Sequence, residues 1–143
     1  MAASVIIADD DPNIVLSLEF LMKRAGYAVR VARDGEAVLS AVAESVPDLV
    51  LLDVMMPKRN GYDVCDALRA DPACRDLRII MLTARGQTVE RTKGLALGAD
   101  AYITKPFASG EVVRCVAEVL ARRQSQAAAA GGFLDPRAGR ARS

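Results

Sequence analysis

Short apolar segments alternate with amphipathic segments along residues 4–123, and this alternation constrains the fold more than any other feature. Five runs rich in aliphatic residues have the length of strands, at 5–8, 28–32, 49–52, 79–82 and 101–104. Several are apolar on both faces, as a parallel strand covered by helices on both sides must be. Between them, apolar residues such as Ile14, Leu18 and Leu21 recur every three to four positions, which predicts helices with one face on a sheet.

The predicted helices carry end signals. Residues that typically cap a helix N-terminus stand before four of them: Asp11, Asp34, Asn60 and Ser109. Gly26 is expected to end the first helix. The segment 87–97 is the poorest helix, because Gly94 interrupts it and it has few large apolar residues. We expect this segment to be the part that moves.

Alternating strands and helices with right-handed crossovers predict an α/β domain with a five-stranded parallel sheet and helices on both faces. The pattern alone leaves open whether the strand order is flavodoxin-like, 2-1-3-4-5, or another doubly wound order. We place this domain at residues 4–123. Residues 124–143 are rich in Ala, Gly and Arg and are expected to form a flexible tail or linker, in which the alanines extend the last helix as far as Gly131.

Composition excludes several kinds of function. The chain has no His, which rules out a Ser-His-Asp nucleophile, a His-bound metal and a phosphohistidine intermediate. Its three cysteines are not arranged as CxxC and predict neither a disulfide framework nor a zinc site. The net charge of +1 gives no general reason to expect nucleic-acid binding. Any acid, base or nucleophile must therefore come from Asp, Glu, Lys, Ser, Thr, Cys or Tyr.

The sequence also bears on location. No apolar run reaches the roughly 18 residues that span a bilayer, and the first residues lack the pattern of a signal peptide, so a cytoplasmic location and no membrane contact are expected. From Arg122 onward there are five Arg against one Asp. This tail either touches nucleic acid or a partner, or is simply solvated; without an aromatic stacking pattern or a helix-turn-helix, the second interpretation is favoured.

Polar residues at the ends of buried strands are the main clue to a site. The first strand runs into Asp9 and Asp10, the third into Asp53, the fourth into Thr83 and the fifth into Lys105. In open α/β sheets, ligands bind outside the carboxyl ends of the strands, where the winding reverses. If the order is 2-1-3-4-5, these five side chains converge in one crevice.

Clustered carboxylates need a cation. Charges about 4 Å apart repel by roughly 4 kcal/mol per pair at an effective dielectric constant of 20. A pocket of oxygen atoms without Cys or His suits Mg²⁺. Asp53 is then a candidate nucleophile toward phosphorus, with Lys105 offsetting charge and the Thr83 hydroxyl bonding a phosphoryl oxygen.

Each of these residues also has a purely structural interpretation. Asp9 and Asp10 are placed to help cap the following helix, and Asp53 to serve as an ordinary turn residue. Thr83 is able to satisfy a backbone group at a strand end, and Lys105 to be a solvated loop residue. Their joint placement on strand ends favours a site.

Four segments together resemble the receiver domain of bacterial two-component response regulators. They are VIIADD at 5–10, LVLLDVMMPKRNG at 49–61, IIMLTA at 79–84 and GADAYITKPF at 98–107. The resemblance covers about residues 4–122. It implies the 2-1-3-4-5 order, an order for which a receiver protein is one of the standard examples.

The resemblance also implies roles for single residues. It makes Asp53 the phosphoacceptor and assigns Mg²⁺ to Asp9, Asp10 and the backbone carbonyl of Met55. Thr83 and Lys105 become phosphoryl-binding residues, and Tyr102 the aromatic residue of the switch; the alternative for Tyr102 is a structural aromatic on an edge strand. Residues that shape the adjacent loops are Pro57, Gly61 and Pro106, whose preceding peptide is commonly cis in such proteins.

The implied function is a phosphorylation-dependent signalling switch rather than an enzyme. A sensor histidine kinase or a phosphotransfer protein is expected to supply the phosphoryl group, and a downstream protein target to bind the switched face. One alternative is a Mg²⁺-dependent phosphatase, which usually has a second Asp where this chain has Met55. Another is a binding module that has lost phosphorylation, against which the acidic pair, Thr83 and Lys105 argue.

Overall fold

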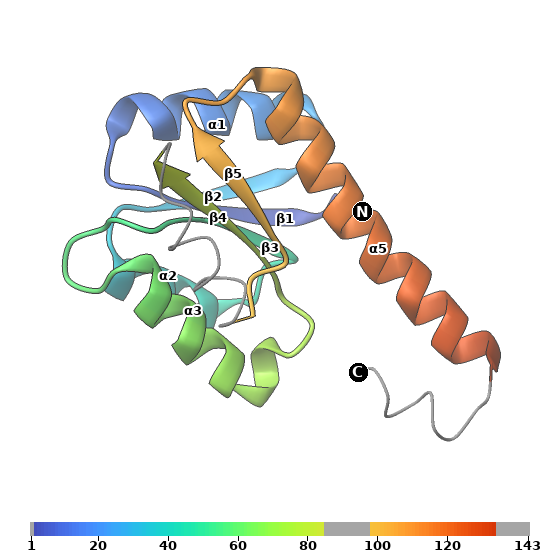
Figure 1. Ribbon diagram of the computed structural model, residues 1–143. Helices are drawn as coiled ribbons and strands as arrows, with labels where there is room; N and C mark the ends of the chain where they lie inside the picture. Colours follow the sequence, from blue (N-terminus) through green and yellow to red (C-terminus); the bar gives the residue numbers. More distant parts are fainter. Residues whose placement is uncertain (1, 85–97, 134–143) are drawn as a thin grey trace.

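The strands form one parallel sheet in the order β2-β1-β3-β4-β5 (Figure 1). They are β1 (Ser4–Ala8), β2 (Ala28–Ala32), β3 (Leu49–Asp53), β4 (Arg78–Ala84) and β5 (Ala101–Lys105). This computed structural model describes residues 2–84 and 98–133. The flavodoxin-like order is confirmed. The winding reverses between β1 and β3, so the carboxyl ends of these two strands mark the position where such folds bind ligands.

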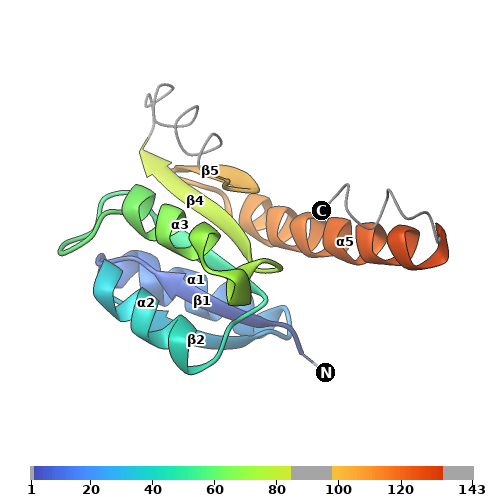
Figure 2. The same cartoon turned by 90° about the horizontal axis from the view of Figure 1, so that it is seen from below.

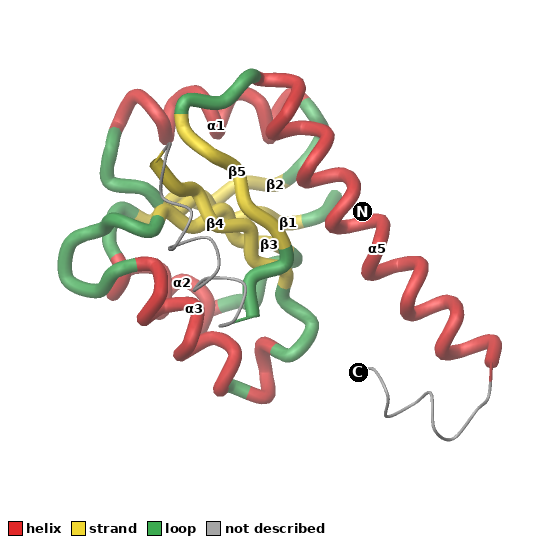
Figure 3. The backbone as a smooth tube through the Cα atoms, viewed as in Figure 1, coloured by secondary structure: helices red, strands yellow, loops and turns green. Residues whose placement is uncertain are grey.

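Helices cover both faces of the sheet. Figures 1 and 2 show α1 (Pro12–Arg24) and α5 (Ser109–Phe133) on one face, and α2 (Gly35–Glu44) and α3 (Gly61–Ala70) on the other. The short helix η1 (Pro72–Cys74) connects α3 to β4. The two helical layers enclose the strands, drawn in yellow in Figure 3. This layered arrangement explains why the strands are apolar on both sides.

The sheet separates two apolar cores. Leu51 faces the core under α1 and α5, and its neighbour Leu52 faces the core under α2 and α3, because successive strand residues point to opposite faces. All five residues of β3 are buried. Burial of each large aliphatic side chain contributes about 1.5–3 kcal/mol. Asp53, the last residue of β3, is therefore carried on a strand that is buried throughout.

Three of the four predicted N-caps are confirmed. The side chains of Asp11, Asp34 and Asn60 each accept a backbone N–H in the first turn of their helix. The prediction for Ser109 was wrong. The carbonyl of Ala108 already accepts the first helical hydrogen bond, and Glu111 Oε1 accepts the Ala108 N–H at 3.4 Å, so the helix begins one residue earlier than expected.

Gly26 ends α1 as predicted. Its φ of +97° is in the left-handed region, and its N–H donates to the carbonyl of Lys23. At the other end of the chain, α5 continues past residue 123 to Phe133, two residues beyond the expected Gly131. The predicted helix at 87–97 and its expected movement lie outside the described residues. Within residues 2–84 and 98–133, no helix combines the length and apolar character needed to cross a membrane.

Candidate functional site

An acidic cluster lies at the carboxyl ends of β1 and β3. Asp9 directly follows β1, Asp53 is the last residue of β3, and the paired Ala8 and Leu52 hold the two strand ends side by side. Carboxylate oxygens of Asp9, Asp10 and Asp53 lie within 4.8 Å of one another. Asp9 is fully buried and Asp53 is 5% exposed, whereas Asp10 is exposed to solvent. The cluster is thus buried at its base and open on one side.

Lys105 reaches this cluster from the far edge of the sheet. Its Nζ lies 2.9 Å from Asp9 Oδ2 and 3.2 Å from Asp53 Oδ1. Because β4 lies between β3 and β5, the long lysine side chain crosses the end of β4 to make both contacts. The peptide between Lys105 and Pro106 is cis. The structure therefore brings together four of the predicted site residues, from three separate strands.

The buried charges perturb one another. Burial, and after it the negative charge of Asp9, raise the pKa of Asp53 to about 6, although Lys105 acts in the opposite direction. For Lys105, burial works against the charged form, but the hydrogen bond to Asp9 and the charges of Asp53 and Asp9 leave the pKa raised. Since one ammonium group faces three clustered carboxylates, the site has an excess of negative charge.

The carboxylates are also oriented by the backbone. The N–H of Asp11 donates to Asp9 Oδ1 at 2.9 Å, and the N–H of Met55 donates to Asp53 Oδ1 at 3.3 Å. The side chain of Met55 itself is exposed. Each buried carboxylate thus has one fixed oxygen. Oxygen donors at this spacing, without nitrogen or sulfur ligands, fit a hard divalent cation such as Mg²⁺, which binds one or two carboxylates and keeps several waters.

Thr83 provides a polar atom without a partner beside the cluster. It follows Leu82, the residue of β4 that pairs with Asp53. Its Oγ1 is buried and has no hydrogen-bond partner among the residues that the structure describes. A buried hydroxyl usually finds a partner, and leaving it without one costs about 1–3 kcal/mol. Thr83 is therefore available to bond an oxygen atom of a group attached to Asp53.

The loop after β3 is built close to the acidic residue. The N–H of Gly61 donates to the carbonyl of Val54 at 2.8 Å. A Cβ at Gly61 would lie 2.4 Å from the carbonyl oxygen of Asp53 and 2.8 Å from Cα of Val54, so only glycine permits this approach. The carbonyl of Pro57 accepts the N–H of Arg59 at 2.8 Å and that of Gly35 at 3.4 Å. These contacts fix the loop against α2.

Tyr102 lies on β5, three residues before Lys105. It is half-buried, stands opposite Met81 of β4, and packs against the core under α2 and α3. The sequence predictions did not include a second polar group at the opposite end of the sheet, where Arg69 and Arg78 contact Asp100. The signal for it was the run Gly98-Ala-Asp100, whose glycine and aspartate both belong to that network.

Comparison with known proteins identifies the class that this fold and site define. A family model described as the response regulator receiver domain matches residues 5–117. The match covers most of the chain, which therefore belongs to the response regulator receiver domain family. Members of this family are signalling switches of two-component systems, in agreement with the resemblance found in the sequence.

Solved structures agree with the family. A putative response regulator from Chloroflexus aurantiacus J-10-fl is 36% identical, covers 85% of this chain and 99% of its own, and superposes with a TM-score of 0.82. The chemotaxis response regulator CheY4 of Vibrio cholerae is 28% identical over 83% of this chain and 99% of its own, with a TM-score of 0.79. NtrX from Brucella abortus, 22% identical, shares the fold with a TM-score of 0.86, but this chain covers only 29% of it.

Proposed function

We propose that this receiver domain accepts a phosphoryl group on Asp53 in a Mg²⁺-dependent reaction and thereby switches a protein-binding face. The observation that carries the proposal is the convergence of the carboxylate cluster, the Lys105 ammonium and the unpartnered Thr83 hydroxyl around one buried carboxylate. Each of these groups has a use once phosphate is attached to Asp53. A buried cluster of carboxylates opposes folding, so its presence here favours a functional role over a structural one.

The reaction is a group transfer to a carboxylate. An oxygen of Asp53 forms a bond to phosphorus while the bond between phosphorus and the donor atom breaks, and the donor leaves with that electron pair. Asp9, Asp10 and the carbonyl of Met55 are the groups proposed to hold Mg²⁺, which when bound would offset charge on the phosphoryl oxygens. The Lys105 ammonium, already 3.2 Å from Asp53, offsets the remaining charge.

Switching follows from the added charge. A phosphoryl group brings close to two negative charges to the carboxyl end of β3 and strong acceptors within the neighbourhood of Thr83 and Lys105. We propose that Thr83 bonds a phosphoryl oxygen and that Tyr102 changes its packing against β4. The phosphorylated state is thus a shift in population between two arrangements of the face next to β4 and β5.

The partners follow from the same chemistry. The donor is proposed to be a sensor histidine kinase or a phosphotransfer protein, and the receiver of the signal a downstream protein rather than nucleic acid or a membrane, with the whole exchange in the cytoplasm. The chain itself acts as a switch that catalyses only its own phosphorylation and slow dephosphorylation. Residues 124–143 are proposed to serve as a tail or linker to the domain at 4–123.

The test is a mass measurement on the intact protein. Wild type is incubated with Mg²⁺ and acetyl phosphate, beside Asp53→Asn and beside wild type in chelator. The proposal expects one phosphoryl group on wild type with Mg²⁺ and none in the other two samples. No gain by a folded wild-type protein, or an equal gain by Asp53→Asn, would contradict it.

A further inference from the structure

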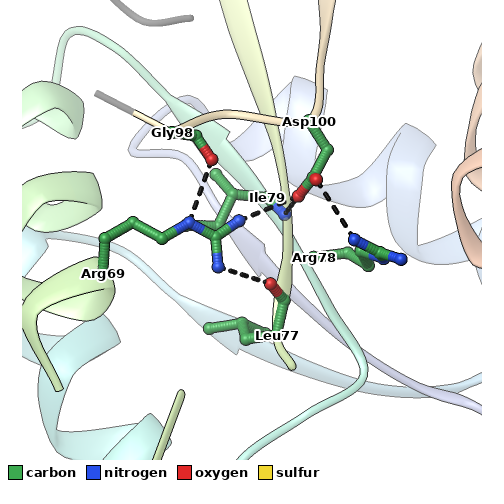
Figure 4. A network of polar contacts seen from close by, with 6 residues as sticks. All are labelled: Arg69, Leu77, Arg78, Ile79, Gly98 and Asp100. Atoms are coloured by element: carbon green, nitrogen blue, oxygen red, sulfur yellow. Dashed lines mark hydrogen bonds and ion pairs between the residues drawn. The ribbon is translucent and has the colours of Figure 1, made fainter. Parts of the chain in front are cut away.

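A polar network lies at the amino ends of β4 and β5 (Figure 4). Asp53 lies at the other end of the sheet, where the strands finish. We call it the Arg69 network; its members are Arg69, Leu77, Arg78, Ile79, Gly98 and Asp100. The guanidinium of Arg69, near the end of α3, uses all three of its nitrogens. Nε donates to the Gly98 carbonyl at 2.9 Å, Nη1 to the Leu77 carbonyl at 2.7 Å, and Nη2 to Asp100 Oδ2 at 2.9 Å.

Asp100 is the centre of this network. Its Oδ2 also accepts the N–H of Ile79 at 2.8 Å, and its own N–H donates to the Ile79 carbonyl at 2.8 Å. Its Oδ1 accepts from Arg78 Nη1 at 3.3 Å. These bonds join the residue before β5 to the second residue of β4 in both directions. Charge-assisted bonds to a half-buried carboxylate hold such a junction more firmly than neutral ones.

The backbone of Gly98 is shaped to fit Arg69. Its φ of +103° is in the left-handed region, where other residues are strained. A Cβ there would also lie 3.0 Å from Cγ of Arg69. Glycine at position 98 therefore permits both this backbone conformation and the close approach of the Arg69 side chain.

The position of β5 matters because the strand carries Lys105. Among the residues that the structure describes, β5 is an edge strand that pairs with β4 alone, and Ile103 is the one buried residue of its five. All five residues pair with β4, and the bonds between Asp100 and Ile79 extend this pairing to the entry of β5. Lys105 lies five residues after Asp100, about 16 Å along the strand. A displacement of one residue would turn its side chain to the other face of the sheet, away from Asp9 and Asp53.

We propose that Arg69 is a positioning residue for Lys105: together with Asp100 it fixes β5 along β4, so that the Lys105 ammonium reaches Asp9 and Asp53. This inference rests on the proposed phosphorylation of Asp53. Arg69 touches none of the reacting groups and acts only through the strand. Removal of the Arg69 side chain should therefore lower the rate of phosphorylation in the same way as removal of the Lys105 ammonium, but to a smaller extent.

A double-mutant cycle tests this. Arg69→Met is expected to lower the rate of phosphorylation by acetyl phosphate and Mg²⁺ about tenfold, since small misplacements of a reacting group are costly. Lys105→Met lowers it more, and the double variant should match Lys105→Met alone, because Arg69 has nothing left to position. An equal further loss in the double variant would overturn the proposal, as would a wild-type rate in Arg69→Met.

A matched control separates positioning from general loss of stability. Leu68→Ala, the buried neighbour on α3, destabilises the domain without touching Asp100 and should leave the rate of the folded protein unchanged. If Leu68→Ala lowers the rate as much as Arg69→Met at equal fraction folded, the proposal fails. Should Arg69→Met not fold, Asp100→Asn, which keeps an acceptor for the Ile79 N–H, takes its place in the cycle.

A second readout does not depend on phosphorylation. Amide hydrogen exchange along 101–105 should be faster in Arg69→Met than in Leu68→Ala, because the entry to β5 is released. If wild type accepts no phosphoryl group, the proposed function fails. Hydrogen exchange along 101–105 then still tests whether Arg69 fixes β5. Unchanged exchange along β5 would contradict the proposal in either case.

Discussion

Lys105 places its ammonium nitrogen 3.2 Å from Oδ1 of Asp53, although β4 separates the strands that carry the two residues. The contact depends on the parallel order of β3, β4 and β5, which brings their carboxyl ends to one edge. It joins residues 52 positions apart in the chain. An acceptor and the cation that offsets its developing charge are thereby held together before any donor binds.

Replacement of Lys105 by Met should slow phosphorylation of Asp53 by roughly a hundredfold, because a preorganised charge next to the transferred group is lost. The rate is measured with acetyl phosphate at saturating Mg²⁺. Lys58→Met is the matched control, since Lys58 is an exposed lysine that lies 3.7 Å from Asp34. A rate for Lys105→Met equal to that of the control would refute the role of Lys105.

Stability without metal should depend on the ionisation of Asp53. Its folded pKa of about 6 is above the ordinary value of 3.8, so the folded protein favours the protonated carboxyl of Asp53. The stability that this protonated form contributes is fully present below pH 3.8 and is lost as the pH rises through about 6. At pH 7.5 in chelator, Asp53→Asn should therefore raise the free energy of unfolding by about 2–3 kcal/mol. The advantage should shrink as the pH falls from 7 toward 4.

Urea unfolding at several pH values measures this difference. Asp66→Asn on the exposed face of α3 is the control and should change stability little at any pH. A destabilised Asp53→Asn at pH 7.5, or a difference that grows as the pH falls, would show that the ionised carboxylate of Asp53 does not oppose folding.

Thr83→Val should separate folding from signalling. It removes a buried hydroxyl that has no partner among the described residues, so the unphosphorylated protein should gain up to about 1 kcal/mol or stay unchanged. After phosphorylation the wild type makes a bond that the variant lacks. The rise in melting temperature on phosphorylation should accordingly be smaller in Thr83→Val than in Thr104→Val on the facing strand. Equal rises would remove Thr83 from the switch.

Gly61→Ala should displace the backbone that carries Asp53 and so lower both stability and the rate of phosphorylation. The added Cβ meets the backbone of Asp53 and Val54, so the end of β3 or the start of α3 must shift, at a cost of about 1–3 kcal/mol. Gly110→Ala is the matched control. Its Cβ meets nothing within 4 Å and improves helix propensity in α5. Thermal unfolding of both variants, with phosphorylation rates, should show losses only for Gly61→Ala.

Much of the fold was predictable because it depends on local signals. The aliphatic runs marked all five strands within one or two residues at each end, and Asp11, Asp34 and Asn60 capped the helices that follow them. The cap at Ser109 was mispredicted because Glu111, three residues after Ala108, sets where that helix begins. Side-chain type alone favoured serine over alanine there.

The candidate site was predictable in position for a different reason. In a parallel sheet the order of strands decides which carboxyl ends are adjacent, so Asp9, Asp53 and Lys105 could be placed together once the order was assumed. The Arg69 network was not predictable in this way. It consists largely of bonds from one side chain to backbone carbonyls of residues 8 and 29 positions away, which leave no periodic pattern in the sequence.

The most direct test of the central claim is the chemical location of the phosphoryl group. Wild type treated with acetyl phosphate and Mg²⁺ is reduced with borohydride, which converts an acyl phosphate to an alcohol, and its peptides are then sequenced by mass spectrometry. The account predicts homoserine at position 53 and at no other aspartate. Unmodified Asp53 beside a modified residue elsewhere, such as Asp9 or Asp10, would contradict it.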